Sequence, residues 1–284
     1  MKIKIASNAG FCFGVKRAIQ IAEETAEKEK KVATLGPIIH NPQMVQQLEK
    51  KGICAFDSID DVTDETVIIR SHGITANEYR RLQDKGIHIV DATCPFVKRA
   101  QQVAEKLTKM GFSLVILGEK HHPEVEALLS YVEDRAIVVS HLDEEILLKD
   151  TRRIGLIAQT TQTEERFERL AIRLLRLSEE LYVAKTICYA TLQRQQATKE
   201  LAREVDIMIV VGGKNSANTA RLAEIARAEG KPTYHIETAA ELKPQWFADT
   251  DKVGITAGAS TPEWIIQDVK EAIQKISNRG VIKS

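Results

Sequence analysis

The sequence lacks any apolar run that approaches the roughly 20 residues of a transmembrane helix, so we expect no membrane-spanning segment. It also lacks an excess of charge, because 40 basic and 40 acidic side chains cancel, and nothing favours nucleic acid or an anionic membrane as a partner. A strand pattern begins at Lys2, which leaves no room for a signal or transit peptide. We therefore predict a cytoplasmic protein.

Two nucleotide-binding motifs are missing as well. No GxGxxG follows a strand pattern, and Gly212-Gly213-Lys214 lacks the upstream glycine of a P-loop, so we expect neither a bound dinucleotide nor ATP hydrolysis. Cysteine is scarce too. Four cysteines in 284 residues do not form a secreted disulfide framework, and in a reducing compartment metal binding or catalysis is the better expectation.

Three of the cysteines each begin a copy of one repeated unit. Cys12, Cys94 and Cys188 follow short apolar runs typical of strands, and 24 residues later a glycine ends a second apolar run. Four residues beyond each glycine stands a polar side chain able to form hydrogen bonds. The three pairs of glycine and polar residue are Gly36 with His40, Gly118 with His122, and Gly212 with Ser216.

The order of elements in the repeat predicts an α/β fold. Each copy reads as strand, helix, strand, helix, strand, strand, followed by a second polar loop, which is typical of mainly parallel sheets. Ligands of such sheets bind beyond the carboxyl ends of the strands, so we expect the polar loops to converge on a common centre with pseudo-threefold symmetry. The predicted lobes are 13–94, 95–187 and 188–284, the last completed by the N-terminal segment 1–12.

The same register separates the fourth cysteine from the others. Cys54 falls inside a short strand, where the other copies carry Ile137 and Thr233. Because free cysteine packs like a small hydrophobic residue, we predict that Cys54 is buried in the core.

Three thiols at equivalent strand-to-helix junctions indicate a metal site, because a helix N-terminus favours the thiolate. Such a set could complete a zinc site with a water, or hold an iron–sulfur cluster one ligand short, and the spacing does not decide between them. The polar loops divide into two groups. A proton relay could use Glu124, His122, Thr160 and Thr161; a phosphorylated tail could be bound by His40, His72, Ser216, Asn218 and Ser260. Ser216 and Asn218 could instead cap the helix that follows them.

Taken together, these motifs resemble those of a known protein family. The motifs NAGFCFGVKRAI, GPIIHNPQ, RSHGI, DATCPFV, HPEVEA, AQTTQT, ICYAT, KNSAN and TAGAST occur in the order found in the LytB/IspH family of hydroxymethylbutenyl diphosphate reductases. The resemblance runs essentially from end to end. It implies three α/β domains around a [4Fe-4S] cluster held by Cys12, Cys94 and Cys188, with one open iron that binds the substrate hydroxyl.

The resemblance also implies roles for the polar residues. Glu124 corresponds to the proton source, assisted by Thr160 and His122, which also contact substrate. The residues that correspond to the diphosphate-binding set are His40, His72, Ser216, Asn218 and Ser260, with Thr161 a weaker candidate. The chain departs from the pattern at Ala217, where some members have a serine; a hydroxyl contact is lost there, although the backbone amide can still contribute.

The implied reaction is a reductive dehydration that yields isopentenyl and dimethylallyl diphosphate. An external carrier such as ferredoxin or flavodoxin would supply the electrons, one at a time. Two other classes of function stay open at this point. One is a hydro-lyase that uses the open iron without net electron transfer, and the other is a non-catalytic metal-binding or sensor protein.

Overall fold

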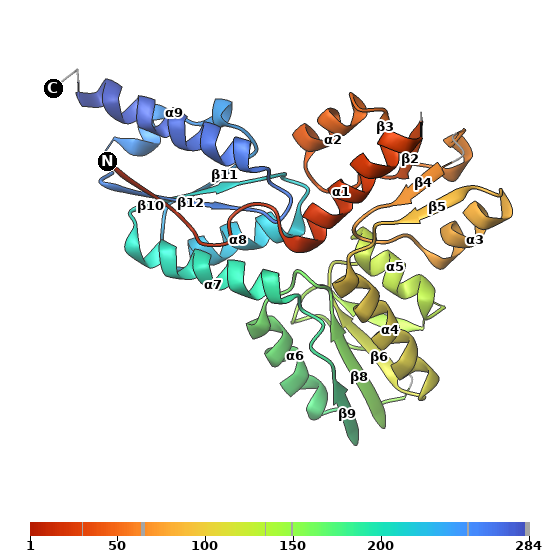
Figure 1. Cartoon of the computed structure of the whole chain (residues 1–284). Coiled ribbons are helices and arrows are strands. Elements are labelled where there is room, and N and C mark those ends of the chain that lie inside the picture. The colour runs from red at the N-terminus through yellow and green to blue at the C-terminus, as the bar shows by residue number, and fades with distance from the viewer. Residues whose placement is uncertain (30, 64–65, 134, 149, 249, 282–284) are drawn as a thin grey trace. The chain divides into compact units, whose positions relative to one another are not determined.

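The computed structural model describes residues 1–29, 31–63, 66–133, 135–148, 150–248 and 250–281 (Figure 1). The chain divides into two compact units. Unit 1 consists of Met1–Phe13, His40–Met44 and Tyr189–Ser284, and unit 2 consists of Gly14–Ile39 and Val45–Cys188.

Unit 2 contains two four-stranded sheets, and every strand pair in them is parallel. The strand order in the first sheet is β3-β2-β4-β5, with bounds β2 Val32–Leu35, β3 Ile53–Phe56, β4 Thr66–Ile69 and β5 His88–Asp91. The order in the second is β7-β6-β8-β9, with bounds β6 Ser113–Leu117, β7 Ala136–Val139, β8 Arg153–Ala158 and β9 Glu180–Val183. The helices that lie wholly or mostly in unit 2 are α1 Phe13–Lys28, α2 Pro42–Glu49, α3 Ala76–Asp84, α4 Pro95–Lys109, α5 Pro123–Tyr131 and α6 Glu164–Leu175, with a 3-10 turn at Ile59–Asp61. The first residue of α1 and the first turn of α2 belong to unit 1.

Unit 1 contains one further parallel sheet, in which the N-terminal strand pairs with the last strand of the chain (Figure 1). Its order is β11-β10-β12-β1, with bounds β1 Lys2–Ile5, β10 Ile207–Val211, β11 Thr233–Ile236 and β12 Lys252–Ala257. Its helices are α7 Tyr189–Glu204, α8 Ala217–Ala228 and α9 Glu263–Val281, with 3-10 turns at Ala239–Glu241 and Pro244–Phe247.

The three sheets share one strand order, and this confirms the predicted α/β fold with parallel sheets. In each sheet the short third strand of the repeat forms one edge, and the strand that leads to a cysteine forms the other. The second edge is β5 before Cys94, β9 before Cys188 and β1 before Cys12. The lobe boundaries at 13–94, 95–187 and 188–284 stay a prediction.

Each repeat contains one helix that the sequence pattern did not predict. After the second polar loop the chain forms α3, α6 or α9 instead of passing directly to the next strand. For α3 a local signal was present: Thr75 caps the helix, Glu78 Oε2 accepts from Thr75 N at 2.6 Å, and Thr75 Oγ1 accepts from Glu78 N at 3.2 Å. This reciprocal capping box marks a helix start.

Each sheet has its own apolar core, because the central strands are buried on both faces by helices. All five residues of β10, for example, are buried, and such strands read as continuous apolar runs rather than alternating ones. Separate clusters form around Ile209 and Val269 in unit 1, and around Ile116 and Leu107 and around Val67 and Leu82 in unit 2. No helix among the described residues combines the length and the apolar character that a membrane crossing requires.

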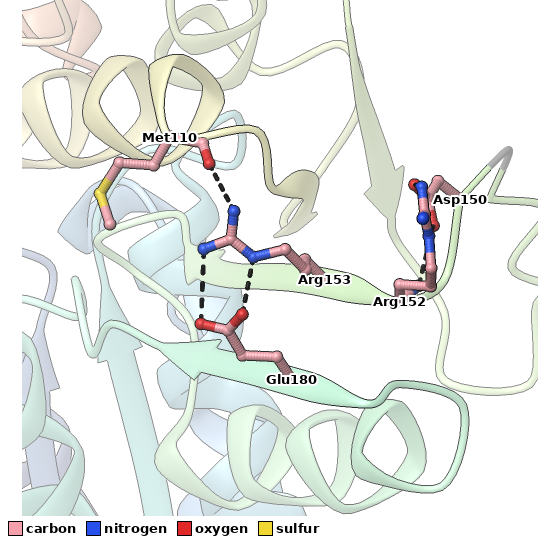
Figure 2. A network of polar contacts seen from close by, with 5 residues as sticks. All are labelled: Met110, Asp150, Arg152, Arg153 and Glu180. Carbon is pink, nitrogen blue, oxygen red and sulfur yellow. Dashed lines mark hydrogen bonds and ion pairs between the residues drawn. The ribbon is translucent and has the colours of Figure 1, made fainter.

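An ion pair holds the strand that leads to Cys188 in register (Figure 2). Arg153 on β8 donates to Glu180 on β9 through Nε at 2.6 Å and Nη2 at 3.5 Å, and through Nη1 to Met110 O at 2.8 Å. The two residues are direct partners in the ladder. Because both side chains are exposed, the pair contributes at most about 1 kcal/mol to stability.

The prediction that Cys54 is buried is wrong. The side chain of Cys54 is exposed, whereas its neighbour Ile53 is only 3% exposed. Cys54 lies on β3, which forms the edge of its sheet next to β2, and on this edge strand Ala55 is exposed as well. A short edge strand offers fewer covering neighbours than a central strand, which the repeat pattern by itself could not distinguish.

Candidate functional site

The three cysteines occupy equivalent places in their sheets. Each donates its backbone N–H to a carbonyl two residues beyond the end of the adjacent inner strand. The bonds run from Cys94 to Ser71 at 3.0 Å, from Cys188 to Thr160 at 3.0 Å, and from Cys12 to Ala259 at 3.1 Å. In each case the next residue along that loop is a predicted site residue: His72, Thr161 or Ser260. The repeated sequence unit therefore corresponds to a repeated hydrogen bond.

Each cysteine also immediately precedes a helix. α1 begins at Phe13, α4 at Pro95 and α7 at Tyr189, and all three thiols are half-buried. A helix N-terminus stabilises a thiolate, and half-burial leaves the sulfur accessible to a metal. This donor set fits a thiolate-bound iron–sulfur cluster. Cys12 lies in unit 1, and Cys94 and Cys188 lie in unit 2, so their action as one ligand set stays a prediction.

Glu124 is the most buried acidic residue at the predicted site. It is 1% exposed, near the start of α5, and its two carboxylate oxygens accept hydrogen bonds from a single residue. Thr160 N donates to Oε1 at 2.7 Å, and Thr160 Oγ1 donates to Oε2 at 2.8 Å. Burial raises the pKa of Glu124 to about 7, and the two bonds from Thr160 oppose that shift. A carboxyl group with this pKa can release or accept a proton near neutral pH.

Thr160 connects this carboxyl group to a cysteine loop. Its N–H and hydroxyl bind Glu124, while its carbonyl accepts from Cys188 N. Thr160 is 7% exposed at the carboxyl end of β8. A shift of this loop would therefore move the proton-bearing group and the thiol together.

His122 is the N-cap of α5 and is 8% exposed. Its Nδ1 accepts from Glu124 N at 3.1 Å, so a neutral ring carries its proton on Nε2. The His72 ring lies edge-on to it, with centroids 5.5 Å apart. The structure thus brings His72, His122, Glu124 and Thr160 together within unit 2.

A second polar network, which the sequence analysis missed, supports the loop after β8. Gln159 Oε1 accepts from Glu119 N at 3.0 Å and from Gln162 Nε2 at 3.5 Å, and Arg166 Nη1 donates to Gln162 Oε1 at 2.8 Å. Gln159 and Gln162 are 0% and 1% exposed. The sequence signal for this network is the pair of glutamines that flank Thr160 and Thr161 in AQTTQT. The buried glutamines hold the loop that carries these two threonines.

Within unit 1, the loop at His40 contacts the loops after β10 and β12. Ser260 Oγ donates to His40 O at 2.9 Å. A Cβ on Gly213 would lie 2.8 Å from His40 O, so only glycine allows this approach. The first copy has one additional loop residue, because Asn41, and not His40, takes the position next to the helix and accepts from Met44 N at 2.8 Å.

The polar side chains of unit 1 differ in the hydrogen-bonding groups that they leave available. Ser216 is the N-cap of α8 and accepts from Thr219 N at 3.3 Å, so it keeps its own hydroxyl proton for donation. Ser260 uses its proton on His40 O and keeps its lone pairs. Asn218 is 5% exposed, and neither of its amide atoms has a hydrogen-bond partner among the described residues. Asn218 therefore does not cap the helix, whereas Ser216 does.

The two remaining predicted residues are Ala217 and Thr161. Ala217 is the first residue of α8, where the backbone N–H has no partner within the helix. Thr161 is half-buried beside Thr160. Thr161 lies in the loop after β8, whereas Ala217 begins the helix that follows the loop after β10.

The sequence matches the model of one protein family, described as LytB protein, over residues 3–274. It is 50% identical over 277 residues to 4-hydroxy-3-methylbut-2-enyl diphosphate reductase of Geotalea uraniireducens, which covers 98% of both chains. The reductase of the same name from Aquifex aeolicus is 47% identical over 286 residues, with 99% of both chains covered.

Two solved structures are similar as well. One is (E)-4-hydroxy-3-methyl-but-2-enyl diphosphate reductase, described as the terminal enzyme of the non-mevalonate pathway; it is 46% identical with a TM-score of 0.69, covering 96% of this chain and 99% of that chain. The other is the E-1-hydroxy-2-methyl-but-2-enyl-4-diphosphate reductase from Plasmodium falciparum. It is 25% identical with a TM-score of 0.87, covering 96% of this chain and 87% of that one.

The raised pKa of Glu124 predicts a pH-dependent loss of stability. Because the folded-state pKa of about 7 lies above the ordinary glutamate pKa of 4.5, the folded protein binds an additional proton between these values. Its stabilising contribution is fully present below the lower value and is lost as pH rises through about 7. We expect the unfolding free energy of the wild type to fall relative to Glu124→Gln across this window, measured by urea denaturation at each pH.

The matched control is Glu126→Gln, an exposed carboxyl group on the same helix. This variant should follow the wild-type pH dependence. Parallel curves for the wild type and Glu124→Gln would show that Glu124 titrates in the folded protein as it does in the unfolded chain.

Proposed function

The chain belongs to the LytB family, and we propose that it reduces 4-hydroxy-3-methylbut-2-enyl diphosphate to isopentenyl and dimethylallyl diphosphate. The near full-length identity to reductases of that name is the observation that carries this proposal. The overall change consumes two electrons and two protons. The C–O bond to the hydroxyl breaks, a C–H bond forms at either end of the allylic fragment, and the oxygen leaves as water.

Loss of the hydroxyl as water requires a proton at the oxygen, and Glu124 is suited to supply it. Burial keeps its pKa at about 7, so a substantial fraction of the carboxyl group is protonated near neutral pH. The Thr160 hydroxyl on Oε2 provides a path by which the proton can pass. The His122 ring, fixed through its Nδ1, directs an Nε2–H donor away from the helix and can contact substrate.

The diphosphate needs hydrogen-bond donors rather than acceptors. In unit 1, Ser216 retains a hydroxyl proton, Asn218 has an unused amide, and the N-terminus of α8 offers backbone N–H groups at Ala217. We assign this binding role to these residues together with His40 and Ser260, and in unit 2 to His72 and Thr161. Ser260 contributes mainly by fixing the His40 carbonyl.

We further propose that Cys12, Cys94 and Cys188 hold a [4Fe-4S] cluster with one open iron. Such a cluster supplies electrons one at a time and a Lewis-acid position for the departing hydroxyl. An external one-electron carrier, a ferredoxin or a flavodoxin in the cytoplasm, would reduce it. The half-buried thiols at three helix starts support this assignment.

The cysteine variants test the proposal most directly. Anaerobically purified wild type should contain about four iron and four sulfide per chain, with visible absorption that dithionite bleaches. Cys12→Ala should lose most of this iron, because a ligand is removed. Cys54→Ala is the matched control and should keep it, since its thiol is exposed on an edge strand away from the repeat position.

Three results would contradict this reading. Zinc in place of iron would favour a metal-binding protein, and turnover without any reductant would favour a hydro-lyase. Loss of iron in Cys54→Ala together with its retention in Cys12→Ala would invert the ligand assignment.

Glu124→Gln should retain the cluster absorption and lose turnover by about 10²- to 10⁴-fold, the range typical of a general acid. The amide preserves the shape of the carboxyl group but cannot transfer the proton. Turnover of the diphosphate substrate with a chemical reductant is the measurement, and Glu126→Gln is the control. Wild-type turnover in Glu124→Gln would remove this residue from the proton pathway.

Asn218→Ala should weaken substrate binding by roughly 10- to 100-fold, the range for a hydrogen bond to a charged group. Iron content should not change. Asn215→Ala, an exposed amide in the same loop, should bind substrate as the wild type does. Calorimetric titration with the substrate measures both variants, and equal affinities would assign Asn218 a packing role instead.

A further inference from the structure

Arg194 is a buried cation that takes no part in the proposed proton transfer or diphosphate binding. Arg194 lies on α7 and is only 2% exposed. Its Nη2 donates to Gly10 O at 2.6 Å across 184 residues of sequence, and its Nη1 donates to Ala190 O at 3.4 Å. Removing a guanidinium from water is costly, so a buried arginine needs a structural or functional reason.

The acceptor of this bond belongs to the loop that carries Cys12. Gly10 O is two residues before the thiol, within roughly 7 Å of chain. Gly10 has φ +91, and a Cβ there would lie 3.1 Å from Ile266 Cδ1 and 3.3 Å from Thr261 O. The loop between β1 and α1 has little regular structure, and Arg194 adds a tether to the bond from Cys12 N to Ala259 O.

A second arginine repeats this arrangement independently in unit 2. Arg17 on α1 donates from Nη1 to Thr93 O at 3.3 Å, and Thr93 immediately precedes Cys94. Arg17 and Arg194 stand five and six residues after a cysteine. Each donates to a backbone carbonyl before a different cysteine, one residue before Cys94 for Arg17 and two residues before Cys12 for Arg194. The recurrence argues against a chance surface contact.

We propose that Arg194 is a positioning residue for the metal cluster. Its guanidinium fixes the Gly10 carbonyl, holds the Cys12 loop in the conformation that binds metal, and places a permanent positive charge against the loop that carries the Cys12 thiol. This inference rests on the proposed function, because it needs the cluster that Cys12 helps to hold.

Loss of the guanidinium has two separable consequences. A buried carbonyl loses its donor and the Cys12 loop gains freedom, so the cluster should dissociate faster. A positive charge near a site that takes up an electron also stabilises the reduced form. Without this charge the midpoint potential should become more negative, which a purely structural role would not produce.

Arg194→Met keeps the length and apolar stem of the side chain and removes both charge and donors. Arg194→Lys restores the charge with poorer hydrogen-bond geometry. Thr198→Val is the matched control: it lies one turn further along α7, and it loses a buried bond of 2.8 Å to the Thr256 hydroxyl without touching the cysteine loop.

The measurements use anaerobically reconstituted protein and need no substrate. One is the rate at which an iron chelator removes the cluster, followed by visible absorption. Each variant is measured at a temperature the same number of degrees below its own unfolding midpoint, so that differences in overall stability do not affect the comparison. The other is the midpoint potential from a redox titration. We expect cluster loss to be about 10-fold to 100-fold faster in Arg194→Met, in line with the effect of residues that orient metal ligands. Its potential should be more negative, Arg194→Lys should be intermediate, and Thr198→Val should match the wild type.

The outcomes are distinguishable. Wild-type rates and potential in Arg194→Met would overturn the inference while leaving the proposed function intact. The same acceleration in Thr198→Val would assign the effect to general weakening of α7. If Arg194→Met does not fold, Arg194→Lys decides through the rate of cluster loss, because a wild-type rate despite the poorer hydrogen-bond geometry of lysine would overturn the positioning role. A wild type that takes up no iron and sulfide would overturn the proposed function itself, and this inference with it.

Discussion

The bond from each cysteine N–H to a strand-end carbonyl is the constraint on which the rest of the site depends. It exists because all strands of each sheet are parallel, so their carboxyl ends meet at one edge and an outer loop can reach the inner one. In unit 2 the carbonyl that receives Cys188 belongs to Thr160, which also holds Glu124. Thr160 thus fixes the backbone of Cys188 just before α7 and also the position of the buried Glu124 carboxyl group.

The same edge explains why polar groups are buried there at all. Glu124, Gln159 and Arg194 are each at least 98% buried, and each has hydrogen bonds to backbone groups in loops. Loops at a sheet edge carry backbone donors and acceptors that helices and strands do not satisfy, and buried side chains complete them. The cost of burying these groups is offset only if the loops are held in one conformation, which is also what a binding site requires.

Sequence reasoning predicted the features that follow from the repeat, and it missed those that depend on tertiary surroundings. The order of strands along the chain, the cysteine positions and the polar loops recur in each copy, so one copy supports the interpretation of the next. The exposure of Cys54 depends on an edge position that no periodicity encodes. α3 was missed because its sequence, ANEYRRLQD, is largely polar and contributes only Leu82 to the buried core.

The apolar periodicity of α7 is weak for a different reason. Its buried face carries Thr191, Arg194, Gln195 and Thr198 beside its apolar residues, so apolar periodicity underestimates how deeply the helix is packed. The repeat nevertheless predicts this helix, because helices occupy the same place after Cys12 and Cys94. The departure from the family pattern at Ala217 is explained by the residues around it. A serine there would add one hydroxyl donor, but the chain already presents the Ser216 proton, the Asn218 amide and the N-terminal amides of α8 within three residues. On the proposed diphosphate-binding role, the alanine therefore removes one of several donors at this helix start.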